Sequence, residues 1–291
     1  NGVPISEDKG DFWSKNYPNR YEFTIIPDEG NNKHYLKIGE ETAYLHLNRE
    51  PRFYANLSFD RGTWYGYGYA SDEPKDLAFY KFRAKEVSGR ITSEDYSYTG
   101  YLNKKVCSYK TSVTDNGLST ERYAFPIIRL ADLYLMYAEA LNNISEGTHY
   151  QVTSWDGSQT YDIFRDKEQM RRGVKPVRMR AGVPDYSDEV YENPKKFFEK
   201  IVHERQIEFF AETQRYYDLR RWKIVEEHEG EQIYGCNTLM NEEYKDMFYL
   251  PVRVAELQTS FSRKQYFWPI SFDELKRNNN LSQAPGWQNY D

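Results

Sequence analysis

The feature that most constrains the fold is a helical repeat of apolar residues between Asn193 and Val225. Asn193 and Pro194 are suited to the N-cap and first turn of a helix. The apolar positions that follow at helical spacing are Phe198, Ile201, Val202, Phe209, Tyr216, Leu219 and Trp222. A single helix of about 30 residues would be long for a globular protein. We therefore expect a break near Glu212–Gln214 that gives two packed helices.

A second apolar stripe follows Pro126, a residue suited to the first position of a helix. Its members are Ile127, Leu130, Ala131, Tyr134, Ala138 and Leu141. The spacing predicts an amphipathic helix that ends near Asn142. Residues 144–193 then form a long excursion, in which we expect Gly173, Gly182 and Pro184 to break regular structure. Because a structureless loop of this length is unusual in a compact domain, short helices should fill part of it.

The first 125 residues show no long helical period. Turn-forming clusters separate short segments with β propensity, such as residues 21–26 and 53–59. We expect short strands, short helices and long loops in this region.

Composition excludes two classes of protein. Aromatic residues make up 17% of the chain, including 27 Tyr and 6 Trp, which argues against disorder. The net charge of −6 and the lack of a run of Lys and Arg argue against nucleic-acid binding.

Cys107 and Cys236 have no metal-type spacing, and whether they form a disulfide stays open. The chain opens without Met or a targeting segment, so we expect it to be a fragment of a longer product.

The 193–225 segment carries charged residues of both signs. Those in its second half include Glu204, Arg205, Glu208, Glu212, Arg215, Asp218, Arg220 and Arg221. Paired carboxyl groups beside an open cleft could serve as the acid and base of a glycosidase. Here nearly every acid has a cation within one helical turn, for example Arg205–Glu208, Glu212–Arg215 and Asp218–Arg221. The pattern favours ion pairing that joins two helices.

Other catalytic and cofactor motifs fail on their residues. His203-Glu204 begins like the zinc-protease motif HExxH, but Ile207 stands where the second His should be. The glycines at 66 and 68 begin like a dinucleotide-binding fingerprint, which then ends in Ser71 and opens no helix. We expect no catalytic residue, no metal and no cofactor.

The segment Trp64-Tyr65-Gly66-Tyr67-Gly68-Tyr69 sets four aromatic rings among glycines. Flat rings on a loop suit a sugar-binding site, because pyranose C–H groups pack on aromatic planes. A loop that folds back to fill an apolar gap explains the segment equally well. Tyr98 and Trp155 are further candidates for ligand contact.

Four stretches in order resemble the SusD/RagB family. Residues 48–55 read NREPRFYA, which is similar to the family's R-D-P-R-F-Y-A element, with Glu50 where Asp is common. Residues 128–140 read IRLADLYLMYAEA, which resembles R-x-A-D-x-x-L-x-x-A-E-A. Residues 204–209 and 215–222 resemble E-R-x-x-E-L and R-W-F-D-L-R-R-W, and residues 268–287 resemble P-I-P-x-x-E-I followed by N-x-N-L-x-Q-N-P-G-W. Residues 210–215 read FAETQR, which departs from the family's F-E-G-x-R turn at the expected break.

The resemblance implies a mostly α fold, with tetratricopeptide-like helix pairs and a loop-rich, irregular ligand-binding lobe that contains short strands. We expect three regions: a loop-rich lobe at 1–125 that carries the ligand site, scaffold helices at 126–225 with the insertion at 144–193, and a loop-rich region at 226–291 that packs on the scaffold. Within this frame the candidate ligand-binding residues are Trp64, Tyr65, Tyr67, Tyr69, Tyr98 and Trp155.

The resemblance also implies a function. Members bind glycans or related nutrients without cutting them and deliver them to a SusC-like, TonB-dependent outer-membrane transporter. They lie on the cell surface, held to the outer membrane by a lipid anchor that would lie outside this chain. Two alternatives stay open: a helical-repeat scaffold that binds peptides or proteins, and a glycoside hydrolase.

Overall fold

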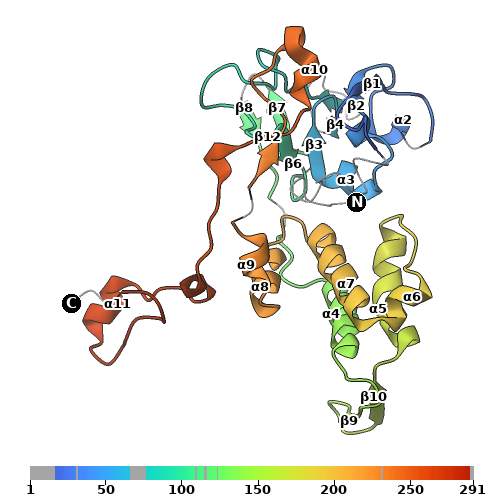
Figure 1. Ribbon diagram of the computed structural model, residues 1–291, viewed down its shortest axis with the longest axis vertical. Coiled ribbons are helices and arrows are strands. Elements are labelled where there is room, and N and C mark those ends of the chain that lie inside the picture. The colour runs from blue at the N-terminus through green and yellow to red at the C-terminus, as the bar shows by residue number, and fades with distance from the viewer. Residues whose placement is uncertain are drawn as a thin grey trace.

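The longer helices gather in one lobe of the molecule and most of the strands in another (Figure 1). A computed structural model describes residues 17–30, 32–65, 77–108, 110–114, 117–122, 124–230 and 232–288. The helical lobe contains α4 (Leu130–Asn142), α5 (Lys167–Arg180), α6 (Asp188–Glu192), α7 (Pro194–Glu208), α8 (Gln214–Arg221) and α9 (Val225–His228). Its core is a cluster of buried apolar side chains from α4, α5 and α7, including Leu135, Met170, Val174, Phe197 and Ile201.

The predicted break in the 193–225 segment is confirmed. α7 begins at Pro194, where the Asn193 side chain accepts a hydrogen bond from the Lys196 backbone N–H. The helix ends at Glu208, and both Ala211 and Thr213 then adopt left-handed backbone conformations. Such conformations cannot continue a right-handed helix, so the chain turns before α8.

The helix after Pro126 begins later than its apolar stripe predicts. α4 starts at Leu130, because Arg129 is extended and acts as its N-cap residue. The Asp132 carboxylate accepts a hydrogen bond from the Arg129 backbone N–H at 3.5 Å. The Arg129 guanidinium meanwhile pairs with Glu208 and Glu212, which holds the preceding segment away from the helix axis.

The prediction that Gly173 breaks regular structure is wrong. Gly173 lies inside α5, a helix of 14 residues, and faces α4. A Cβ atom on Gly173 would lie 2.5 Å from the backbone oxygen of Tyr134 and 2.9 Å from the Ala138 Cβ. The glycine therefore allows a close approach of two helices.

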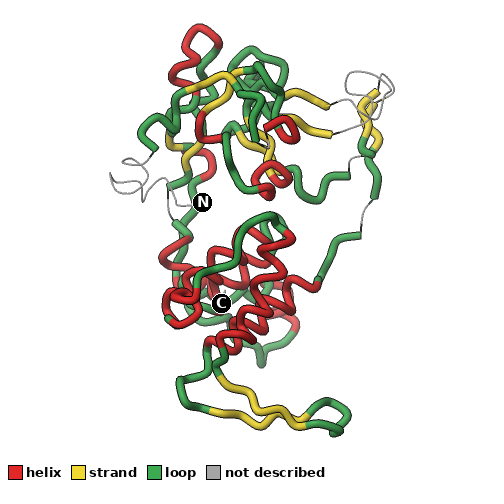
Figure 2. The backbone as a smooth tube through the Cα atoms, turned by 90° about the vertical axis from the view of Figure 1, so that its right-hand side faces the viewer, coloured by secondary structure: helices red, strands yellow, loops and turns green. Residues whose placement is uncertain are grey.

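The insertion also contains a β-hairpin. Strands β9 (His149–Thr153) and β10 (Thr160–Phe164) pair antiparallel. The hairpin projects from the helical lobe at the end remote from the strand lobe (Figures 1 and 2).

The strand lobe is built from short antiparallel pairs. The pairs are β1 (Phe23–Ile25) with β2 (Glu41–Ala43), β3 (Leu57–Phe59) with β6 (Tyr101–Asn103), β4 (Thr63–Tyr65) with β5 (Leu77–Phe79), β7 (Ser112–Thr114) with β8 (Gly117–Ser119), and β11 (Tyr234–Gly235) with β12 (Val252–Arg253). Its helices are α2 (Asn32–Tyr35), α3 (Pro51–Asn56) and α10 (Lys245–Phe248), with 3₁₀ turns at Tyr44–His46 and Glu242–Tyr244. The mostly α class with a loop-rich, strand-containing lobe is thus confirmed.

Residues beyond β12 leave the strand lobe (Figure 1). This segment holds 3₁₀ turns at Ala255–Leu257 and Arg263–Tyr266 and the helix α11 (Phe272–Arg277). Trp268 lies beside Tyr216 of α8, with ring centroids 6.1 Å apart. The division of the chain into three regions stays a prediction. Both cysteines are free thiols, Cys107 exposed and Cys236 buried.

Candidate functional site

Trp64 lies on β4, in a ribbon with β5 where Trp64 pairs with Ala78. Its half-buried ring packs against Tyr80, with centroids 5.5 Å apart. The backbone of Tyr65 continues β4 opposite Leu77. Tyr67 and Tyr69 lie outside the described residues. The role of Trp64 in ligand binding stays a prediction.

A buried aspartate fixes the base of this ribbon. Asp60 accepts hydrogen bonds from the Phe82 backbone N–H and the Tyr249 hydroxyl, both at 2.7 Å. Burial raises the pKa of Asp60 above its ordinary value. The backbone pairs Arg61–Tyr80 and Tyr80–Gly62 then carry the register toward β4 and β5. These hydrogen bonds and the β4–β5 pairing hold the backbone of Trp64 and Tyr80 in register.

Tyr98 lies on a loop of the same lobe. Its side chain is 37% exposed, and its ring meets Tyr96 edge-on with centroids 4.9 Å apart. The Arg90 guanidinium covers the Tyr96 ring at 5.0 Å. Tyr98, Tyr96 and Arg90 thus form a partly exposed cluster in the strand lobe.

Trp155 lies apart from these residues. It sits in the turn between β9 and β10, where its side chain is 99% exposed. The hairpin is at the opposite end of the molecule from β4 (Figures 1 and 2). The structure therefore does not bring Trp155 together with Trp64 in one site.

The acidic residues of α7 and the following turn bind cations from several elements. Arg52 of α3 contacts Glu204 at 2.7 Å and Glu208 at 2.9 Å, and so joins the two lobes. Arg129 contacts Glu208 at 2.6 Å and Glu212 at 2.7 Å. Lys105 also pairs with Glu212, Arg178 with Glu204, and Arg180 with Glu208.

These pairs determine the protonation of the carboxyl groups. Burial alone would raise the pKa of Glu208, but hydrogen bonds from Arg129 and Arg52 hold it below its ordinary value. The pKa of Glu212 is likewise lowered, against the effect of burial, by hydrogen bonds from Arg129 and Lys105. A glycosidase acid must instead keep its proton through a raised pKa. Glu208 and Glu212 are thus suited to structural ion pairing.

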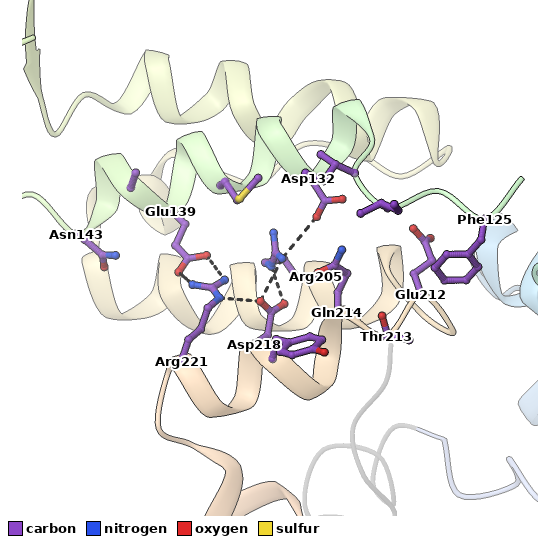
Figure 3. A pocket seen from close by; sticks show the side chains of 15 residues that line it. Phe125, Asp132, Glu139, Asn143, Arg205, Glu212, Thr213, Gln214, Asp218 and Arg221 are labelled. Atoms are coloured by element: carbon purple, nitrogen blue, oxygen red, sulfur yellow. Dashed lines mark hydrogen bonds and ion pairs between the residues drawn. The ribbon is translucent and has the colours of Figure 1, made fainter. Parts of the chain in front are cut away.

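A groove of about 710 Å³ lies between α4 and α8 (Figure 3). Its floor is an ion-pair chain: Arg205 contacts Asp218 at 2.7 Å, Asp218 contacts Arg221 at 2.8 Å, and Arg221 pairs with Glu139. Its rim carries exposed apolar side chains, namely Phe125, Ile127, Ile128, Met136 and Tyr217. The floor charges pair with one another, although the buried Arg205 Nη1 has no hydrogen-bond partner among the described residues. The exposed side chains of the rim offer mainly apolar contact.

Two features of the described residues bear on cofactors and membranes. In the ranges that the structure describes, no three His, Cys, Asp or Glu side chains lie where they could hold a metal ion. No helix in the same ranges has the length and apolar character needed to cross a membrane.

The fold and the site define a class of protein that joins a helical scaffold to an irregular lobe with exposed aromatic residues. The model of the SusD family matches residues 7–287, and the chain belongs to this family. It is 26% identical over 248 residues to SusD-like protein P2 of Formosa agariphila, covering 77% of this chain and 41% of that protein.

Solved structures show the same fold. The structure named BT4246 has 25% identity and a TM-score of 0.69, covering 93% of this chain and 40% of that one. A SusD-like protein from Bacteroides fragilis has 26% identity and a TM-score of 0.63, covering 84% of this chain and 40% of that one. The chain thus spans about two fifths of the length of these relatives.

Sequence reasoning missed part of the exposed aromatic surface. Tyr150 and Val152 of β9 are 55% and 49% exposed, yet neither was a candidate. The signal was present, because alternating apolar and polar residues flank the turn residues Asp156-Gly157.

Proposed function

We propose that this protein binds glycans at the cell surface, without cleaving them, and delivers them to a SusC-like, TonB-dependent outer-membrane transporter. Membership of the SusD family over residues 7–287 carries the proposal. The proposed location is the outer membrane, through a lipid anchor outside this chain. No cofactor is needed for this role.

The proposed binding surface is the aromatic part of the strand lobe, formed by Trp64, Tyr65, Tyr67, Tyr69 and Tyr98. Support comes from the half-buried Trp64 ring on its fixed frame and from the partly exposed Tyr98. Such rings combine an apolar face for sugar C–H groups with polar tips for hydroxyl groups. Trp155 lies outside this surface, in the turn of the β9–β10 hairpin at the opposite end of the molecule.

The absence of catalysis is part of the proposal. Its support is that Glu204, Glu208 and Glu212 each pair with at least two cationic side chains. A carboxylate committed to several cations is a poor proton donor and a poor nucleophile.

One observation favours a second function, that of a scaffold for peptides or proteins. The rim of the α4–α8 groove is apolar, with Ile127 81% and Tyr217 62% exposed. A helix or peptide could place apolar side chains there.

Calorimetric titration against panels of neutral glycans and of peptides separates these functions. We expect binding to at least one glycan, weakened about 5- to 10-fold by Trp64→Ala, since stacking on a ring is worth roughly 1–3 kcal/mol for nucleobases and a sugar lies at the lower end. Loss of the Tyr80 contact should lower stability only slightly, by about 1 kcal/mol. Tyr244→Ala, an exposed residue of the same lobe, is the matched control. A destabilised Trp64→Ala protein whose folded fraction binds normally would show that the ring only fills a gap.

A further inference from the structure

The hairpin β9–β10 exposes an aromatic face that no other described element covers. Tyr150 pairs with Ile163 and Tyr161 with Val152. Because side chains alternate along a strand, these four residues share one face. Ile163 packs against the helical core at the base, whereas Tyr150, Val152 and Tyr161 are 55%, 49% and 49% exposed. The apolar face therefore runs from the core out into solvent.

The opposite face of the hairpin is largely polar, with the Phe164 ring stacked on His149 at a centroid distance of 4.7 Å. His149 and Gln151 contact the Asp162 carboxylate at 2.8 Å and 2.7 Å. Thr153 and Thr160 lie 3.3 Å apart between hydroxyl oxygens. Side-chain hydrogen bonds on this face thus join the two strands, whereas the other face carries the exposed rings of Tyr150 and Tyr161.

The tip adds a third ring. Trp155 is 99% exposed, and the turn beside it is fixed by the Asp156 carboxylate, which accepts from the Ser154 hydroxyl at 2.6 Å and the Ser158 backbone N–H at 3.1 Å. The hydrogen bond from Ser154, with those from Ser158, lowers the pKa of Asp156 to about 2. The carboxylate beside Trp155 is therefore ionised at neutral pH.

Charge restricts what this face can bind. The hairpin and its flanks hold four acidic side chains and one arginine: Glu146, Asp156, Asp162, Asp166 and Arg165. Excess negative charge repels phosphates and acidic sugars. An ionised Asp156 next to Trp155 also opposes insertion of the tip into a bilayer, because a carboxylate in the hydrocarbon region is costly. A neutral or a cationic partner remains.

Size decides between a protein, neutral or basic, and a neutral sugar. Five residues of strand span about 17 Å, and two strands lie about 5 Å apart, so one face of the ribbon offers on the order of 200 Å². A stable protein interface needs about 800 Å² per partner. Tyr150 and Tyr161 are diagonal neighbours, about 7–8 Å apart. Two rings at this spacing suit a short run of sugar units.

We propose that the β9–β10 hairpin is a second glycan-binding surface, in which Tyr150, Tyr161 and Trp155 stack against a neutral, hydroxyl-rich chain. This inference rests on the proposed function, because it assumes that the protein binds glycans. The two surfaces lie at opposite ends of the molecule (Figure 1). A short oligosaccharide should therefore occupy them independently, whereas a long polysaccharide can engage hairpins and strand lobes of several molecules and gain avidity.

The test counts sugars per protein chain by calorimetry and native mass spectrometry. The probes are neutral hexasaccharides: maltohexaose, cellohexaose, xylohexaose, laminarihexaose and mannohexaose. For a probe that binds, we expect two sugars on the wild type. The variant Tyr150→Ser/Tyr161→Ser/Trp155→Ala should weaken one of the two binding steps about tenfold or more. Thr153→Ala/Thr160→Ala, on the polar face of the same strands, should keep both.

Each outcome has one meaning. Binding of one sugar, unchanged by the hairpin variant, overturns the inference and leaves the proposed function standing. Two sugars that both survive in the hairpin variant overturn it as well. Failure of the wild type to bind any neutral glycan refutes the proposed function and the hairpin site together. An unchanged melting temperature in the hairpin variant shows that the lost step reflects the surface and not the fold.

Discussion

Replacement of Asp218 by alanine should destabilise the helical lobe strongly. Asp218 and Arg205 are 4% and 3% exposed, and the carboxylate accepts from Arg205 through two nitrogen atoms, at 2.7 Å and 3.2 Å. It also contacts Arg221 at 2.8 Å. The alanine variant would leave Arg205 buried with Asp132, 3.7 Å away, as its remaining acidic neighbour.

The expected loss follows from this burial. Removal of one partner from a buried ion pair costs about 3–5 kcal/mol, because the other charge stays desolvated. For a domain of this size, such a loss corresponds to a melting temperature lower by roughly 10 °C. The same deletion in the exposed pair Lys37–Glu40, 55% and 35% exposed, should cost about 0–1 kcal/mol.

Urea unfolding of Asp218→Ala, with Glu40→Ala as the matched control, measures the difference. A double variant, Arg205→Met/Asp218→Leu, should recover at least half of the loss, since it removes both charges and keeps the apolar volume. The reasoning is refuted if Asp218→Ala unfolds within about 1 kcal/mol of the wild type. It is equally refuted if that variant keeps its stability and loses glycan binding, which would make Asp218 a ligand contact.

Two further predictions concern pH and packing. Burial, followed by the nearby Arg49, lowers the pKa of His46 from 6.5 to about 3, so between these pH values the unfolded chain binds a proton that the folded chain does not. The free energy of unfolding should therefore rise with pH from about 3 to 6.5, with a smaller slope in His46→Asn. An equal slope in the two proteins would exclude His46 as the cause. Gly173→Ala should lower the free energy of unfolding by about 1–3 kcal/mol, because the new Cβ would lie 2.5 Å from a backbone oxygen of α4. The control Lys175→Ala, on the exposed side of α5, should leave stability nearly unchanged. A stabilised Gly173→Ala protein would show that the two helices can move apart freely.

Local sequence patterns predicted the scaffold well, because they depend on neighbours along the chain. Helical spacing located α7 and α8. The acidic residues Glu204, Glu208, Glu212 and Asp218 are ion-paired, as the charge pattern indicated. Most of the cationic partners of these acids could not be predicted from the sequence. Spacing suggested Arg205–Glu208, whereas Glu208 contacts Arg52 and Arg129, residues distant in sequence that only the packing of the two lobes brings near.

Within the insertion at 144–193, prediction from local sequence was wrong in two places. Gly173 was interpreted as a breaker from its intrinsic preference, but close packing of α5 on α4 requires a residue without a Cβ. The hairpin was missed although its alternation was readable. Residue type alone cannot reveal that β4, which carries Trp64, and the β9–β10 hairpin, which carries Trp155 in its turn, stand at opposite ends of the molecule. Tyr67 and Tyr69 lie outside the described residues.

The central claim is that this member of the SusD family binds glycans and leaves them intact. The most direct measurement is titration of the wild-type protein with the neutral hexasaccharides, followed by prolonged incubation of the saturated complex and mass spectrometry of the sugar. The account predicts saturable binding of at least one probe and recovery of the full-length hexasaccharide alone. Release of shorter sugars, abolished in Glu208→Gln or Glu212→Gln, or no binding to any probe, would contradict it.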